Sequence, residues 1–151
     1  TLVPDSPSAL TSDQGRDTLK ESSFLTEITA RLKEQGIRVS IFLEASPRMV
    51  EGAASIGADR VEFYTGPFAA QYRTDPRAAI AGHIAAAQEA SQLNVGVNAG
   101  HDLNLDNLRF YASMIPNLLE VSIGHALVCD ALVYGMENTV QLYKRQLIID
   151  S

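Results

Sequence analysis

Short apolar segments rich in β-branched residues alternate along the chain with longer segments of helical character. An apolar run of strand length between turn residues is typical of a strand buried on both faces, and parallel sheets are built from such strands separated by helices. The sequence therefore predicts four βα units. The four expected strands cover residues 37–43, 60–64, 93–97 and 118–123.

The expected helices are marked by residues that favour helix ends. Residues 47–56 follow a serine and begin with a proline, which predicts an N-cap and a first helical position, and Gly57 predicts the end of this helix. An Asp-Pro pair predicts the start of a long alanine-rich helix over residues 76–92. Further helices are expected over residues 16–35, 104–112 and 127–147, the last as one or two helices, with a loop over 65–74.

Parallel strands separated by helices suit a doubly wound sheet or a (β/α)8 barrel. A dinucleotide-binding sheet would carry a GxGxxG motif after its first strand, and residues 44–47 contain no glycine. Glycine and polar residues instead follow the third and fourth strands, where barrel enzymes hold phosphate after strands seven and eight. The predicted fold class is therefore α/β, a (β/α)8 TIM barrel. Residues 1–151 are expected to form its C-terminal half, strands five to eight with their helices, as one domain without the N-terminal half.

Composition and charge narrow the class of protein. The chain has 151 residues, 46% of them hydrophobic, which is enough for one domain with a core. Its net charge is −6 and the charged residues are interspersed, so neither nucleic acid nor a membrane surface is an expected partner. The single cysteine, Cys129, cannot form an internal disulfide, which favours a cytoplasmic location. Because the chain starts at Thr1 rather than methionine, we expect a fragment.

Two histidines follow glycines at the ends of the third and fourth strands. His101 ends the segment VNAGH, where an imidazole can give and take protons near neutral pH. Gly124 and His125 lie in SIGHA, where a glycine allows close backbone approach and the N–H groups of a following helix favour phosphate. Spacing alone leaves open that His101 caps loop backbone and that Gly124 only serves a tight turn. No metal is expected, because ligand spacing is lacking.

Other polar residues have simpler interpretations. Glu62, within a short strand, is expected to pair with a base or water inside the barrel, with catalysis as the less favoured alternative. Thr65 and the glycine after it could line a pocket or form a turn. His83 is expected at the surface or in an interface, and Cys129 is expected to be a buried, inert thiol.

The segments GIRVSIFLEA, GADRVEFYTGPFA, LNVGVNAGHDL and LLEVSIGHAL occur in an order and spacing that resembles the second half of the pyridoxine 5'-phosphate synthase family. The resemblance starts at LVPDSP and covers nearly the whole chain. It implies a cytoplasmic (β/α)8 barrel enzyme of vitamin B6 biosynthesis, usually a homo-octamer, that needs no cofactor. Members condense 3-amino-2-oxopropyl phosphate with 1-deoxy-D-xylulose 5-phosphate and release phosphate and water, so phosphorylated small molecules are the implied partners.

The resemblance also implies roles for individual residues. His101 takes the place of the family's proton donor, Gly124 and His125 that of its phosphate-binding pair, and Thr11 that of a substrate-contacting threonine. Asp102 stands where the family often has glycine, and its carboxylate would repel phosphate unless only its backbone N–H faces the ligand. The other catalytic groups of the family lie on strands one to three, which this sequence does not contain. We therefore expect the chain alone to be inactive.

Two alternatives to this function remain open from the residues. One is a different sugar-phosphate barrel enzyme such as an epimerase or an aldolase, although an aldolase needs a lysine at a strand end and none is found at these ends. The other is an inactive half-barrel that binds phosphate or self-associates. Free strand edges and exposed apolar surface would favour such association.

Overall fold

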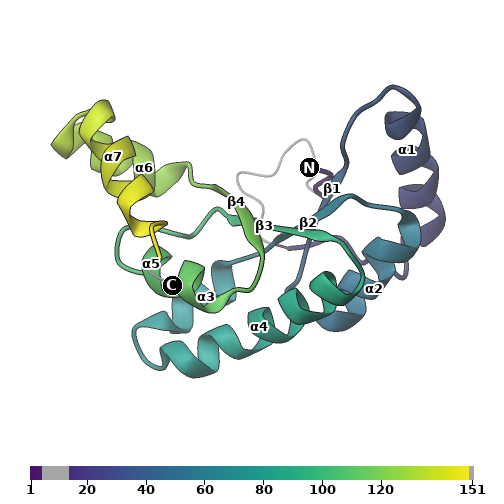
Figure 1. Ribbon diagram of the computed structural model, residues 1–151, viewed down its shortest axis with the longest axis horizontal. Helices are drawn as coiled ribbons and strands as arrows, with labels where there is room; N and C mark the ends of the chain where they lie inside the picture. Colours follow the sequence, from purple (N-terminus) through teal and green to yellow (C-terminus); the bar gives the residue numbers. More distant parts are fainter. Residues whose placement is uncertain (5–13, 150–151) are drawn as a thin grey trace.

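One parallel β-sheet organises the computed structural model, which describes residues 1–4 and 14–149 (Figure 1). The four strands lie side by side in the order in which they occur in the chain. They are β1 (Ser40–Leu43), β2 (Arg60–Phe63), β3 (Gly96–Gly100) and β4 (Leu118–Ser122). Every neighbouring pair is parallel, and helices connect successive strands. The βα alternation predicted from the sequence is confirmed, and the fold class is α/β.

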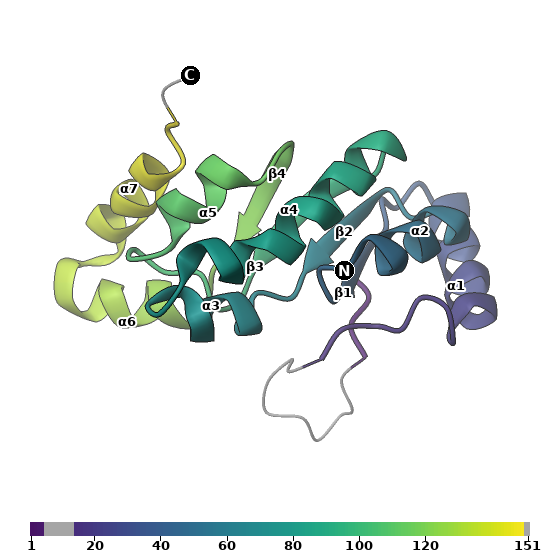
Figure 2. The ribbon, with the colours of Figure 1, turned by 90° about the horizontal axis from the view of Figure 1, so that it is seen from below.

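Helices occupy one face of this sheet. Within the described residues, α2, α4 and α5 lie on that face, and no helix covers the opposite one (Figures 1 and 2). Helix α1 packs beside α2 at the β1 end, and α6 packs against α7 at the β4 end. The helices are α1 (Ser22–Glu34), α2 (Pro47–Ile56), α3 (Gly66–Tyr72), α4 (Pro76–Gln92), α5 (Leu108–Met114), α6 (His125–Tyr134) and α7 (Met136–Gln146).

Successive side chains of each strand alternate between the helix-covered face and the open face. The side chains toward the helices are apolar and form the core with α2, α4 and α5; on the strands they are Ile41, Leu43, Val61, Phe63, Val97 and Ala99. Four residues of the other face stand in register across the sheet, and we call them the open-face row: Phe42, Glu62, Asn98 and Glu120. A core on one face and polar groups on the other are consistent with part of a (β/α)8 barrel.

The two helices with the strongest end signals have the predicted bounds. Helix α2 begins at Pro47 and ends before Gly57, whose φ of +85° lies in the left-handed region that glycine adopts without strain. Helix α4 begins at Pro76, and the side chain of Asp75 accepts a hydrogen bond from the Ala78 N–H at 2.9 Å. Local capping chemistry therefore fixes these ends.

Several predicted bounds were wrong. The first strand begins at Ser40 rather than residue 37, and helix α5 covers Leu108–Met114 rather than residues 104–112. Residues 66–72 form helix α3 rather than a loop, because the Gly-Pro pair opens a helix. The third strand begins at Gly96 rather than residue 93. Asn94, with φ +57°, and the bond from the Val95 N–H to the Ala90 carbonyl still belong to the end of α4. The first helix begins at Ser22, six residues later than predicted.

The last part of the chain is much more exposed than the rest. The expected final helical segment is two helices, α6 and α7, separated at Gly135, which has φ +78°. None of the ten residues of α6 is buried. Leu132 is 84% exposed and Val133 75% exposed. Strand β4, at the edge of the sheet, also has no buried residue.

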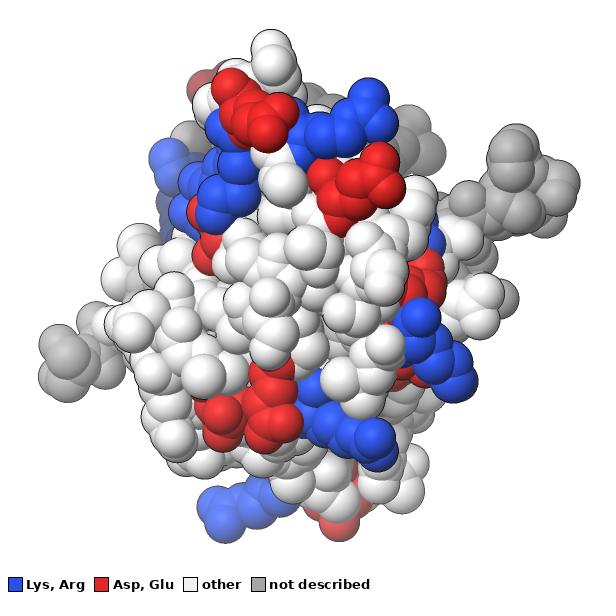
Figure 3. Space-filling model, turned by 90° about the vertical axis from the view of Figure 1, so that its right-hand side faces the viewer, with Lys and Arg blue, Asp and Glu red and all other residues white. Residues whose placement is uncertain are grey.

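Acidic and basic side chains alternate over the surface. On the side of the molecule that carries α1 and α2, they lie above and below an uncharged band without forming a patch of one sign (Figure 3). This agrees with the interspersed charges of the sequence. Among the described residues, no helix is both long and apolar enough to cross a membrane.

Candidate functional site

Four of the five residues predicted from the sequence line one cavity at the carboxyl ends of β3 and β4. His101 and Asp102 follow β3, and Gly124 and His125 connect β4 to α6. The cavity measures about 560 Å³, and its remaining lining residues are Ala69, Asn104 and Ala126. The two histidines, 24 positions apart in the chain, therefore border the same space. The fifth residue, Thr11, lies outside the described residues.

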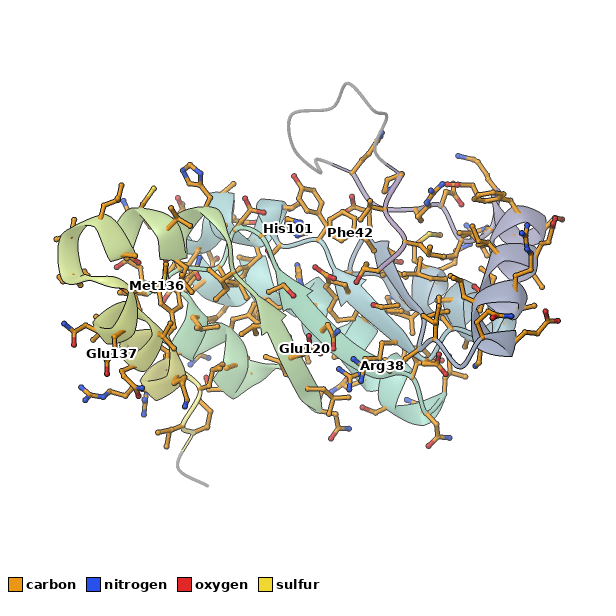
Figure 4. The ribbon with its side chains drawn as sticks, turned by 90° about the horizontal axis from the view of Figure 1, so that it is seen from above. Arg38, Phe42, His101, Glu120, Met136 and Glu137 are labelled. Atoms are coloured by element: carbon orange, nitrogen blue, oxygen red, sulfur yellow. The ribbon has the colours of Figure 1, made fainter. Side chains whose placement is uncertain are left out.

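A left-handed turn presents His101. Its φ is +59°, a conformation that costs a non-glycine residue on the order of 1 kcal/mol. Its N–H donates to the Ser122 carbonyl at 2.9 Å, which continues the β3–β4 pairing. Gly100 must be glycine, because a Cβ there would clash with the same carbonyl. The imidazole packs edge-on against Phe42 at 5.1 Å between ring centroids, near the carboxyl end of the sheet (Figure 4).

A buried carboxylate faces the imidazole. Glu62, from β2, is 5% exposed, and its Oε1 lies 3.6 Å from His101 Nδ1. Its Oε2 accepts a hydrogen bond from the Thr1 hydroxyl at 2.8 Å. Nδ1 is buried and has no hydrogen-bond partner within the described residues. At 3.6 Å the two groups form an ion pair whenever the ring is protonated. This arrangement suits a proton donor.

Thr65 fixes the turn that carries His101. Its hydroxyl donates to the Gly100 carbonyl and accepts from the Asp102 N–H at 3.3 Å. The Asp102 N–H also donates to the Gly100 carbonyl at 2.8 Å. Thr65 is fully buried, so its contribution is to the turn rather than to the cavity lining. The Asp102 N–H is thus engaged within the protein, and Asp102 borders the cavity beside it.

The start of α6 borders the other side of the cavity. Gly124 is the N-cap residue and His125 the first helical residue. Nothing lies within 4 Å of where a Gly124 Cβ would be, so the backbone here is open to a ligand. The N-terminus of a helix carries partial positive charge and free N–H groups, which favour an anion. The cavity lining includes no lysine or arginine, so the start of α6 and the histidines are the groups here that could bind an anion.

Cys129 was expected to be buried, and this was wrong. The thiol is exposed and lies 3.6 Å from His125 Nε2, one helical turn earlier in α6. Residues i and i+4 of a helix lie on the same face, so the spacing of the two residues could have indicated this contact.

His83 was expected at the surface or in an interface, and the surface interpretation was wrong. It is 5% exposed, and its Nδ1 lies 2.9 Å from the Tyr111 hydroxyl. The rings of Phe63 and Phe68 each contact it at 5.9 Å between centroids. Burial lowers the pKa of His83 to about 4 and raises that of Tyr111 above its ordinary value. His83 is therefore a neutral core residue that ties α4 to α5.

Comparison with protein families discriminates among the functions that the residues left open. Residues 1–148 match the family described as pyridoxal phosphate biosynthesis protein PdxJ. The chain belongs to the PdxJ family. The match favours this family over the epimerase and aldolase alternatives. Within the described residues of this PdxJ member, no group of three or more histidine, cysteine or acidic side chains could hold a metal ion.

Curated relatives agree with the family. A protein of Cytophaga hutchinsonii is 56% identical over 147 residues, which are 97% of this chain and 62% of that protein. A protein of Bacteroides thetaiotaomicron is 52% identical over 147 residues, again 97% of this chain and 62% of that protein. One of Porphyromonas gingivalis is 46% identical over 149 residues, 99% of this chain and 63% of that protein. All three are named pyridoxine 5'-phosphate synthase. The chain thus spans less than two thirds of the length of these PdxJ relatives.

Proposed function

We propose that this chain forms the phosphate-binding part of a pyridoxine 5'-phosphate synthase, an enzyme of vitamin B6 biosynthesis. The observation that carries the proposal is the shared cavity of His101 and His125 in a member of the PdxJ family. Its relatives carry the name of this synthase. The substrates are two phosphorylated small molecules, 3-amino-2-oxopropyl phosphate and 1-deoxy-D-xylulose 5-phosphate.

In the proposed reaction, the amine of the first substrate condenses with the carbonyl of the second and water leaves. Proton transfers and eliminations then close the pyridine ring and release phosphate. His101 protonates a departing oxygen, because its ring borders the cavity and its buried Nδ1 faces a carboxylate. Glu62 supports this role by facing the His101 ring with its carboxylate. Asp102 and Thr11 contact substrate, the latter by family resemblance alone.

A substrate phosphate is held at the start of α6. The Gly124 backbone and the first N–H groups of the helix meet the phosphate oxygens, and His125 adds a side-chain donor. The Asp102 carboxylate opposes this binding electrostatically, so the helix end and His125 must outweigh it. Fixing the phosphate places the reacting carbon near His101, which is the positioning effect that accelerates such condensations.

The complete protein, in this proposal, is a cytoplasmic (β/α)8 barrel that assembles into a homo-octamer and uses no cofactor. The present chain supplies strands five to eight as the C-terminal half of the barrel domain. The remaining catalytic groups come from strands one to three. The chain alone is then inactive, and neither nucleic acid nor membrane is a partner.

Replacement of His101 tests the role of proton donor. In a complete synthase that carries this C-terminal half, His101→Ala should lower kcat about 100- to 10,000-fold and change KM little, because proton transfer is lost while the phosphate site remains. His125→Ala is the matched variant, and it should raise KM more than His101→Ala does. Steady-state kinetics on both variants measure this split. Unchanged kcat in His101→Ala would remove His101 from the mechanism.

A further inference from the structure

A second polar cluster lies on the open face of the sheet, away from the cavity. Arg60 Nη1, from β2, donates to Asn98 Oδ1 at 3.0 Å and to Glu120 Oε2 at 2.8 Å. The Arg60 side chain is 18% exposed and that of Glu120 is 49% exposed, so solvent reaches the carboxylate of this ion pair. Arg38 Nη2 approaches Glu120 at 3.6 Å and is 59% exposed. Arg38 and Glu120 lie toward the opposite end of the sheet from His101 (Figure 4).

Gly96 gives Arg60 a path across the sheet. The two residues are register partners on β2 and β3. A Cβ on residue 96 would lie 2.8 Å from Leu119 Cδ1 and 3.0 Å from Arg60 Cγ, which is closer than ordinary packing allows. Because residue 96 has no side chain, the stem of Arg60 passes over β3 and its guanidinium reaches Glu120 on β4. The glycine therefore leaves room for both the Leu119 side chain and the stem of Arg60.

Arg60 also fixes the orientation of the Asn98 amide. A guanidinium only donates hydrogen bonds, so the Asn98 atom that faces it is the carbonyl oxygen and the NH2 group points to the other side. Asn98 is 5% exposed and stands in the open-face row between Glu62 and Glu120. Strand β3 therefore places an amide between two carboxylates of the same face, Glu62 on β2 and Glu120 on β4.

The two carboxylates of the row have different partners. Glu120 is paired with Arg60 and Arg38. Glu62 accepts from the Thr1 hydroxyl and faces His101, and no lysine or arginine pairs with it within the described residues. The cations of the sheet thus neutralise one carboxylate and leave the other to act on the imidazole.

We propose that Arg60 is a positioning residue for the site: by neutralising Glu120, it leaves Glu62, which faces His101, as the one carboxylate of the row without an arginine partner. This inference deepens the proposed function and rests on it for its catalytic meaning. It concerns the electrostatics of His101, which can be measured without turnover.

The expected magnitude follows from the strand geometry. Asn98 is in register with Glu120, and His101 follows Asn98 by three residues, which is about 10 Å along a strand. A Glu120 carboxylate that has lost its arginine partner should, at that distance, move the titration midpoint of the His101 ring by roughly half a pH unit at an intermediate effective dielectric constant. The other ionisable groups around the ring are Glu62 from β2, the adjacent Asp102, and His125 across the cavity from α6. The ring of Phe42, from β1, does not ionise.

NMR titration of the His101 ring in the chain tests the proposal, and the His101→Ala variant assigns its signals among the three histidines. Arg60→Met should move the titration midpoint to higher pH by roughly half a unit, because Glu120 loses its partner. Glu120→Gln should move it to lower pH. The double variant Arg60→Met/Glu120→Gln should return it toward the original value, and Arg60→Lys should leave it nearly unchanged.

Several outcomes would overturn the proposal. It fails if Arg60→Met leaves the titration unchanged, or if the double variant shifts as far as the single one, since the effect would then come from altered packing. Circular dichroism checks that each variant is folded. If Arg60→Met does not fold, the single variants Glu120→Gln and Arg60→Lys test the proposal in its place. A chain that shows these shifts but binds no phosphate would contradict the proposed function and leave the role of Arg60 intact.

Discussion

The two sides of the cavity come from regions that differ sharply in packing. His101 follows β3, in the region of β1, β2, β3 and α4 where the strand side chains facing the helices are fully buried. His125 opens α6, a helix without a buried residue, next to an edge strand that also has none. His101 is held by contacts with residues of the neighbouring strands. The position of the other histidine depends on a helix that the described residues leave exposed.

The two histidines therefore differ in what positions them: the sheet positions His101, and an exposed helix positions His125. The contacts of His101 with Phe42, Ser122 and Glu62 come from three different strands, so the sheet itself places it. The exposed apolar side chains of α6 and α7 show that this end has surface to bury against another partner; they include Val128, Leu132, Val133, Tyr134, Met136 and Val140. Three predictions test this difference in packing between the sheet with α4 and the exposed α6, from the largest expected effect to the smallest.

Truncation of a core aromatic residue should cost far more stability than truncation of an α6 residue. Phe63 is fully buried between the sheet and α4, so Phe63→Ala should lower the free energy of unfolding by about 3–5 kcal/mol. Leu132, 84% exposed, should change it by less than about 0.5 kcal/mol when replaced by alanine. Urea denaturation of both variants measures the difference. Equal losses would mean that α6 is packed and that the contrast is wrong.

Acid should destabilise the packed region through His83. Because burial lowers its pKa to about 4 from an ordinary 6.5, the unfolded chain binds the proton more readily than the folded one. Stability is therefore full above pH 6.5, falls as the pH drops toward 4, and the loss approaches about 3 kcal/mol below that. Urea denaturation of wild type and His83→Gln at several pH values isolates this contribution. An identical pH dependence in both proteins would contradict a buried, neutral His83.

The ends of α2 and α4 were the part of the fold that the sequence predicted well. The first-turn prolines of both helices, Gly57 after α2 and the Asp75 cap of α4 act within one turn, so the local sequence is sufficient. The start of β3 was missed because Val95 has strand character but is bonded back to Ala90, a contact set by the end of α4. The burial of His83 was missed because its partner, Tyr111, is 28 residues away and only the tertiary fold brings them together.

Exposed apolar side chains on α6 should promote self-association of the chain. Two adjacent residues, Leu132 and Val133, are at least three-quarters exposed, and burying each would stabilise an assembly by about 2 kcal/mol. Leu132→Lys with Val133→Lys should therefore shift the chain toward monomer in size-exclusion chromatography. Phe24→Lys, at an exposed position on α1, is the matched control. A wild-type chain that elutes as a monomer would contradict the prediction.

For the site, the sequence predicted the glycine-histidine pairs at neighbouring strand ends, and both histidines line the cavity. That success reflects a simple rule, since the carboxyl ends of parallel strands lie at one edge of the sheet. Glu62 and Thr65 were harder to interpret. Their contacts with His101 and Gly100 cross from β2 and its following turn to β3, so register had to be known first.

A titration of the chain with inorganic phosphate, followed through the ring signals of the histidines by NMR, tests the common site most directly. A phosphate held in the cavity should move the signals of His101 and His125 together, with one saturation curve, and leave buried His83 unchanged. His125→Ala should abolish the response of His101. Ring signals of His101 and His125 that respond with different affinities, or not at all, would contradict a single phosphate site between the two strand ends.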